Sequence, residues 1–235
     1  SMILTVDAVG YKNGVIRDIL INAELVDGAL RFEQVSAEFP GGSDFNVQGE
    51  LTTSKKVPTF TGDLSIVTND LRSVLSWLSI KPPPVPADRL RRVNIKSQIL
   101  ATPKQIQLTG LDVGFDSSRL NGGVILALRK RPGIGAALVI DRLNGDAYLP
   151  AEEKIKRAGG SKKSSKSTGA DPVKKLVSNK RASTPLSALG VLNTFDANFN
   201  LHIKSAIYKG TPVKDLVAEG LLYNGALDLK RLSVG

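Results

Sequence analysis

Hydrophobic and polar residues alternate along most of this chain. Residues 46–51 and 60–66 carry an apolar residue or glycine at every second position, and Val93, Ile95 and Ile99 continue the pattern. A period of two is typical of a β-strand with one apolar face and one face in water. Gly, Pro, Asn or Asp interrupts these segments every eight to twelve residues up to about residue 150, which predicts an antiparallel β protein.

One helix is predicted near residues 70–79. Asn69 or Asp70 can cap it, and the prolines at residues 82–84 must end it. Its apolar positions follow helical spacing: Leu71, Val74, Leu75 and Leu78. We expect this stripe to lie across an edge or an end of the sheet. The stretch is far shorter than the roughly 20 residues that cross a bilayer, so no transmembrane helix is predicted.

The chain repeats itself. Residues 5–36 align without a gap with residues 202–233, and eight of the 32 aligned pairs are identical. Conservative pairs such as Arg17 with Lys214 extend the match. The shared unit predicts a strand, a Tyr-Lys turn, a second strand, an Asn/Asp-Gly hairpin turn and a third strand.

Another copy lies 74 to 76 positions after the first, and all three copies share one irregularity. Apolar residues alternate, skip one extra position and then alternate again. The positions involved are Leu30, Phe32 and Val35; Ile106, Leu108 and Leu111; and Leu227, Leu229 and Leu232. A β-bulge that absorbs the extra residue would keep the apolar side chains on one face. Recurring bulges bend a sheet in one sense, which predicts a curved structure.

These patterns predict a mainly β fold: a curved, antiparallel, repetitive β-sheet with one or two short helices. Two architectures are compatible with the pattern: an open groove and a taco-like sandwich. Because the last copy stops before its remaining strands, we expect the chain to be a segment of a longer repetitive protein.

The net charge of +10 is concentrated in one segment. Residues 154–181 hold ten of the 32 Lys and Arg residues and one of the 22 acidic residues, so the remainder is close to neutral. Lys, Ser and Gly dominate there, and few large apolar groups offset the ordering entropy. We therefore predict three parts: a repetitive antiparallel β unit over 1–150, a basic flexible linker over 151–184, and a short helix plus strands over 185–235 that repeat the pattern of 5–36.

No catalytic centre, cofactor site or metal site is predicted. Cysteine is absent, which excludes disulfides and thiolate chemistry, and the acidic residues stand singly at turns. His202 is the single histidine and lies on the polar side of a predicted strand, with no nucleophile placed beside it. No glycine pattern matches a phosphate-binding loop. We therefore interpret the chain as non-enzymatic.

Two stretches carry recognisable motifs of strand, bulge and turn. The first runs from Leu30 to Leu51 as LRFEQVSAEFPGGSDFNVQGEL and continues to VPADRLRR at residues 85–92. The second is FDANF at residues 195–199, which leads into YKG and VKDL. Together they resemble large proteins of the AsmA family, over nearly all of the chain except the basic linker.

This resemblance implies a periplasmic segment of a protein that is anchored in the inner membrane of a two-membrane bacterium. It also implies a long β groove, polar outside and apolar inside, that guides phospholipid or another envelope lipid between the two membranes. Inner- and outer-membrane partners would act through the parent protein, and no nucleic acid is expected. The alternative is a structural scaffold that regulates assembly of outer-membrane protein or lipopolysaccharide without carrying lipid.

Two sets of residues are candidates for binding. The predicted lipid-groove lining is Val47, Leu51, Phe60, Leu64, Ile66, Val93, Ile95 and Ile99. Their alternative role is to pack the core of a closed sandwich. The candidate contacts to a polyanion or lipid head group are Lys162, Lys163, Lys166, Lys174 and Lys175. For the linker, the alternatives are a solubilising segment without a partner and a polyanion-binding module.

Overall fold

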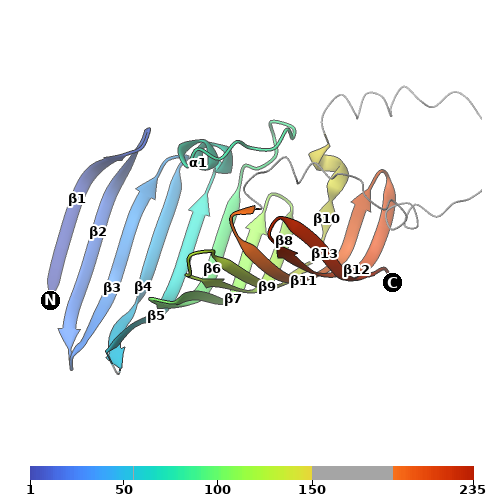
Figure 1. The fold of residues 1–235 in the computed structure, drawn as a ribbon. Coiled ribbons are helices and arrows are strands. Elements are labelled where there is room, and N and C mark those ends of the chain that lie inside the picture. Colours follow the sequence, from blue (N-terminus) through green and yellow to red (C-terminus); the bar gives the residue numbers. More distant parts are fainter. Residues whose placement is uncertain (55, 150–192) are drawn as a thin grey trace, which may run out of the picture.

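The structure is a computed structural model that describes residues 1–54, 56–149 and 193–235 (Figure 1). The predicted basic linker with its five candidate lysines and the predicted helix after residue 185 lie outside the described residues. Strands make up most of the described chain, which confirms the prediction of a mainly β fold. Within these ranges no helix has the length and apolar character needed to cross a bilayer.

Thirteen strands and two short helices are described. The strands are β1 (Met2–Tyr11), β2 (Gly14–Val26), β3 (Ala29–Phe39), β4 (Ser43–Ser54), β5 (Val57–Thr68), β6 (Val93–Thr102), β7 (Gln105–Phe115), β8 (Ser118–Ala127), β9 (Gly133–Ile140), β10 (Leu143–Asn144), β11 (Asp196–Tyr208), β12 (Thr211–Tyr223) and β13 (Ala226–Ser233). The helices are α1 (Leu71–Trp77) and the 3-10 turn η1 (Gly145–Tyr148). The helix expected near residues 70–79 is thus present.

All strands belong to one open sheet, in the order β1 to β9, then β11, β12 and β13, with β10 beside β11. Neighbours are antiparallel from β1 to β9 and again from β11 to β13. β9 and β11 instead run parallel, as do β10 and β11. A parallel pair needs a long crossover connection, and residues 141–195 provide one between β9 and β11. The sequence did not predict this junction because period-two alternation looks the same in both kinds of pair.

The repeat predicted from the sequence is also a repeat of structure. Shifting β2 by 197 positions gives the bounds of β12, and shifting β3 by 76 positions gives the bounds of β7. Left-handed backbone recurs at equivalent turns: φ is 53° at Lys12 and 54° at Lys209, and it is 50° at Asp27 and 49° at Asn224. The same local sequence therefore folds in the same way in each copy.

A bulge lies at the predicted place in all three copies. Between Phe32 and Val35, β3 places two residues opposite one residue of β4. Between Leu108 and Leu111, β7 does the same against β8. The register of β13 against β12 slips by one residue next to Gly220. The recurring bulge is confirmed, and each one returns the apolar side chains to the same face of the sheet.

The sheet is a single layer over most of its area. Six hydrophobic residues are buried among those described, and no large side chain there is fully buried. Two sheets packed face to face would enclose a continuous core of inward side chains. Of the two predicted architectures, the structure therefore has the open, curved sheet and not the taco-like sandwich.

One margin of the sheet is covered. α1 lies over the ends of the strands (Figure 1), with Asp70 as its N-cap residue. The Trp77 ring lies 5.6 Å from the ring of Phe39, and the indole N–H of Trp77 donates to the carbonyl oxygen of Tyr11 at 3.0 Å. These contacts confirm that the helix lies across an end of the sheet.

The strands of the sheet end at two opposite margins. The capped margin is the end with the turns at residues 12–13, 40–42, 116–117 and 209–210, where α1 and η1 lie. The open margin is the opposite end, with Lys56 between β4 and β5 and with the turns at residues 27–28, 103–104, 128–132 and 224–225.

Candidate functional site: the apolar face of the sheet

Cross-strand partners align apolar side chains into rows that cross the sheet. Directly opposed residues in neighbouring strands point to the same face. The row nearest the open margin crosses eleven strands without a polar residue: Leu25, Leu30, Leu51, Phe60, Ala101, Ile106, Leu126, Ile134, Ala197, Leu222 and Leu227.

A second row runs nearer the capped margin: Ala37, Phe45, Ile66, Ile95, Val113, Leu120, Ile140, Ile203 and Leu216. A middle row runs between them: Ile21, Val35, Val47, Leu64 and Ser97, then Leu111, Gly122, Leu138, Leu201, Ala218 and Leu232. Ser97 is the one polar residue in these rows. It is 6% exposed, and its hydroxyl donates to the carbonyl oxygen of Thr109 at 2.9 Å, so its polarity is satisfied within the sheet.

The apolar face is large. Strands lie about 4.8 Å apart, so the eleven neighbouring strands of the first row span about 50 Å. From Phe60 in the first row to Ile66 in the second, six residues at about 3.3 Å each give a width of about 20 Å. The hydrocarbon of one bilayer leaflet is about 15 Å deep. The face is therefore wide enough for an extended acyl chain and long enough for several.

All eight predicted lining residues project from this face, because the registered pairs of β4, β5 and β6 place them there. Seven of them are half-buried. Val93 differs, since it is 8% exposed and pairs with the buried Thr68 beside the capped margin. Val93 therefore belongs to the few buried residues beside the capped margin. Contact between lipid and these eight residues remains a prediction.

The lining predicted from the sequence ends at β6. The structure places Leu111, Leu138 and Leu201 in the middle row of the same face. The repeat alignment already carried a signal for them, because it superimposes Leu64 on Leu138. Extending the lining through the repeat would have identified the second half of the face.

The apolar face is hollowed near its C-terminal end. A depression of about 620 Å³ lies beside β10, β11 and β12. Its large apolar lining residues are Leu143, Ile203, Ile207, Val213, Leu216 and Val234. An apolar group has room to enter the sheet surface at this place.

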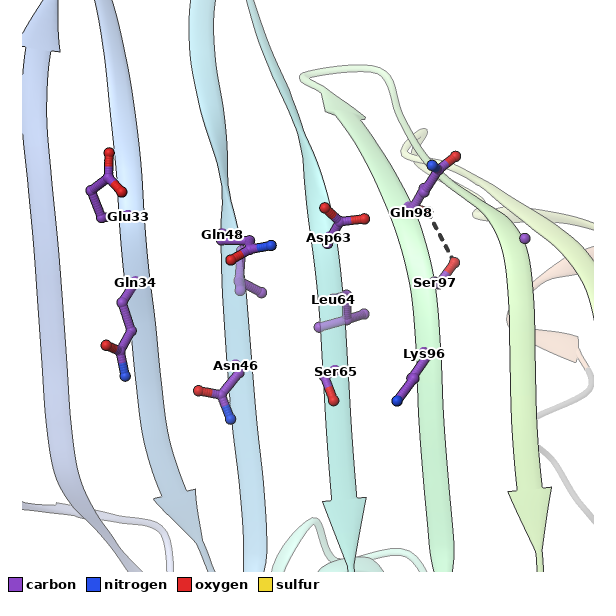
Figure 2. A pocket seen from close by; sticks show the side chains of 12 residues that line it. Glu33, Gln34, Asn46, Gln48, Asp63, Leu64, Ser65, Lys96, Ser97 and Gln98 are labelled. Carbon is purple, nitrogen blue, oxygen red and sulfur yellow. Dashed lines mark hydrogen bonds between the residues drawn. The ribbon is translucent and has the colours of Figure 1, made fainter.

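The opposite face is polar. Figure 2 shows polar side chains gathered on this side of β3 to β6, with Leu64 behind the strands. They surround a shallow depression of about 550 Å³ and include Gln34, Asn46, Gln48, Asp63, Ser65, Lys96 and Gln98. The sheet is therefore amphipathic, with one face suited to water and the other to an apolar partner.

Asp116, in the turn between β7 and β8, joins the segment before β6 and η1 at the capped margin. Its carboxylate accepts hydrogen bonds from the backbone N–H groups of Leu90 and Arg91 at 3.0 and 3.1 Å and from the Tyr148 hydroxyl at 2.8 Å. Partial burial acts to raise the pKa of Asp116, but these hydrogen bonds outweigh it and hold the pKa below its usual value. Burial and the bond to Asp116 raise the pKa of Tyr148, so the phenol remains a donor.

Asp116→Asn is expected to destabilise the capped margin. The side-chain amide has one acceptor oxygen in place of two, so it cannot accept all three hydrogen bonds. The expected loss in the free energy of unfolding is about 1–3 kcal/mol. The folded pKa lies below the ordinary value of 3.8. The carboxylate therefore stabilises the fold above about pH 4, and this contribution is lost as pH falls through the folded pKa. Thermal unfolding, followed by the fluorescence of the single tryptophan, should show a lower midpoint for the variant at neutral pH and convergence in acid. Equal midpoints at neutral pH would contradict the role of Asp116.

His202 lies on the polar face, as predicted. Its Nε2 atom is 3.3 Å from Oδ1 of Asp215. Asp215 has a φ of 48°, and the equivalent residue of the first copy, Asp18, has a φ of 50°, so this acidic residue recurs as a feature of the strand backbone. Within the described ranges, no three His, Asp or Glu residues gather in a way that could hold a metal ion.

Comparisons with family models, with curated proteins and with solved structures give no match for this chain. The function of the apolar face therefore has to be judged from its physical properties. These are its continuity across the strands, its lack of a covering layer among the described residues, and the polar face behind it.

Proposed function

We propose that this chain is a non-enzymatic segment of a cell-envelope protein that holds phospholipid on the apolar face of its sheet. One observation carries the proposal: apolar rows cross the sheet from β2 to β13, and no second layer covers them among the described residues. Soluble proteins rarely expose a contiguous apolar patch larger than a few hundred Å². Acyl chains have the chemistry and the length to cover this face.

The energetic gain follows from the hydrophobic effect. Each CH₂ group that leaves water contributes about 0.8 kcal/mol, so a dozen methylenes that enter water unprotected cost about 10 kcal/mol. A continuous apolar face removes most of that cost along its length, while the polar head group stays in water. Lipid would therefore cross an aqueous gap on such a surface without a large barrier.

The AsmA-like motifs support a place for this segment in the cell envelope. In this proposal the segment lies in the periplasm, and its parent protein is anchored in the inner membrane. It guides phospholipid or another envelope lipid between the inner and outer membranes and so maintains the outer membrane. Partners at either membrane act through the parent, and neither a cofactor nor nucleic acid takes part.

A structural scaffold is the second candidate, and one observation favours it. β1 is the outermost strand on one side of the described sheet, and it exposes Ile3 at 68% and Leu4 at 47%. Consecutive strand residues point to opposite faces, so β1 is apolar on both sides. An edge of this kind suits pairing with a strand of another protein. Such a scaffold would regulate assembly of outer-membrane protein or lipopolysaccharide without carrying lipid.

Native mass spectrometry of the protein purified without detergent separates the two candidates. We expect the protein to retain phospholipid in near-stoichiometric amounts, which solvent extraction then releases for identification. A folded, lipid-free protein that co-purifies with a stable protein partner would instead support the scaffold. Circular dichroism of the same sample provides the control that the sheet is intact.

A further inference from the structure

The turns of the open margin carry a run of basic residues. In an up-and-down sheet every second turn falls at the same end, so the β4–β5, β6–β7 and β8–β9 turns are neighbours there. These three turns contribute Lys56, Lys104, Arg129, Lys130 and Arg131. Each turn is two strands from the next, which spaces them about 10 Å apart.

The arginines of this run are already engaged. Asp196 lies 2.6 Å from the guanidinium of Arg131 and 3.4 Å from that of Arg129. The Arg131 guanidinium also lies over the ring of Tyr223, 5.9 Å from its centroid. One acidic residue therefore balances part of this charge and ties the β8–β9 turn to β11.

The three lysines are different. Lys56, Lys104 and Lys130 are exposed, and their ammonium groups form no ion pair with another described residue. Each is near the apolar row that borders the open margin. Lys56 is four residues from Phe60, and Lys104 is two residues from Ile106, which corresponds to roughly 7–13 Å along the strands. Unpaired positive charge thus follows the border of the apolar face over three successive turns.

The capped margin has a different electrostatic character. Acidic residues pair with arginines there: Asp70 lies 3.9 Å from the guanidinium of Arg91, and Asp88 lies 3.1 Å from that of Arg89. Asp116 accepts from Tyr148 and two backbone amides, while Asp146 accepts from the amides of Lys209 and Gly210 at 2.6 and 2.7 Å. α1 also covers the ends of strands at this margin (Figure 1). A head group attached to a chain on the apolar face therefore has access to water, and to free positive charge, at the open margin.

From this geometry we infer that the open margin binds the phosphate of anionic phospholipid head groups through Lys56, Lys104 and Lys130, while the acyl chains lie on the apolar face. This inference rests on the proposed lipid-holding function and adds a choice of lipid class and an orientation. A lysine ammonium attracts a phosphate as a point charge, which favours lipids with a net negative charge over zwitterionic lipids. The attraction is exposed to solvent, so it weakens as salt rises.

The test uses the whole chain and mixed vesicles with equal amounts of phosphatidylglycerol and phosphatidylcholine. The protein is incubated with vesicles and re-isolated, and the two bound lipids are quantified at low and high salt. We expect the wild type to be enriched in phosphatidylglycerol, by about fivefold for each lysine that engages a head group. The triple variant Lys56→Gln, Lys104→Gln, Lys130→Gln should bind a similar total amount of lipid with at least a tenfold smaller preference.

The matched control removes three other exposed lysines, Lys81, Lys96 and Lys204, by the same change to glutamine. These residues lie away from the open margin, so the control has the same net charge and should keep the preference for phosphatidylglycerol. An unchanged preference in the open-margin variant, or an equal loss in both variants, would overturn the inference and leave the lipid-holding function in place. If the wild type takes up neither lipid, the proposed function fails and the head-group site fails with it.

Discussion

Deletion of Asp63 from β5 is expected to abolish cooperative folding of the sheet. β5 pairs with β4 and with β6 without a bulge, so no extra residue can absorb the lost position. Leu64 and Ile66 would then point to the polar face, and Ser65 would point to the apolar face. Re-exposing two large side chains costs about 3–6 kcal/mol, which is comparable with the total stability of a domain.

Urea unfolding followed by circular dichroism measures this effect. We expect the deletion variant to show no cooperative transition, or a midpoint far below that of the wild type. The matched control is deletion of Gly110, which also removes one strand residue. Thr109 and Gly110 of β7 together oppose Gly123, so without Gly110 the residues Leu108 and Leu111 stand two positions apart and stay on the apolar face. The control should therefore keep a cooperative transition. Equal midpoints for the Asp63 deletion and the wild type would show that alternation in β5 does not set the register.

Leu64→Asp is expected to remove most of the bound lipid while leaving the sheet folded. Leu64 lies in the middle row, between Val47 and Ser97 on the neighbouring strands. It is half-buried, so a carboxylate there stays hydrated in the lipid-free protein. An acyl chain laid over this position would instead take the charge out of water, which costs several kcal/mol. We therefore expect at least a fivefold lower phospholipid content by native mass spectrometry.

Ser65→Asp is the matched control for Leu64→Asp. Ser65 is the next residue of β5 and projects from the polar face (Figure 2), so the same charge is added at the same place along the strand. This variant should retain its lipid, and both variants should keep the circular dichroism spectrum of the wild type. Equal lipid content in the two variants would show that the lipid does not occupy this part of the apolar face.

The strands, the bulges and α1 were predictable from the sequence because each depends on side chains within a few residues of one another. The alternation of apolar and polar residues predicted the strands. The extra residue after Phe32 and after Leu108 predicted the bulges, and the strand register confirms both. The leucine stripe and the prolines after it predicted α1. The repeat was visible because the same turn chemistry recurs, with left-handed backbone at Lys12 and at Lys209.

The long-range features were not predictable in this way. Alternation has the same period in parallel and antiparallel pairs, so the junction of β9 with β11 could not be anticipated. Alternation also describes the inner face of a sandwich as well as it describes an open face. Asp116 and Tyr148 are 32 residues apart in the chain, and no local pattern indicated that they meet at the cap.

The sequence by itself determined where this protein forms strands, where they bulge and which side of each strand is apolar. These properties depend on side-chain period and turn chemistry, which act over a few residues. Tertiary structure alone decided that eleven strands align their apolar sides into one face, that this face stays open among the described residues, and that Lys56, Lys104 and Lys130 lie along the same margin. The physical reason is that register and strand order join residues far apart in the chain, and the energy of those pairings depends on partners that no local segment contains.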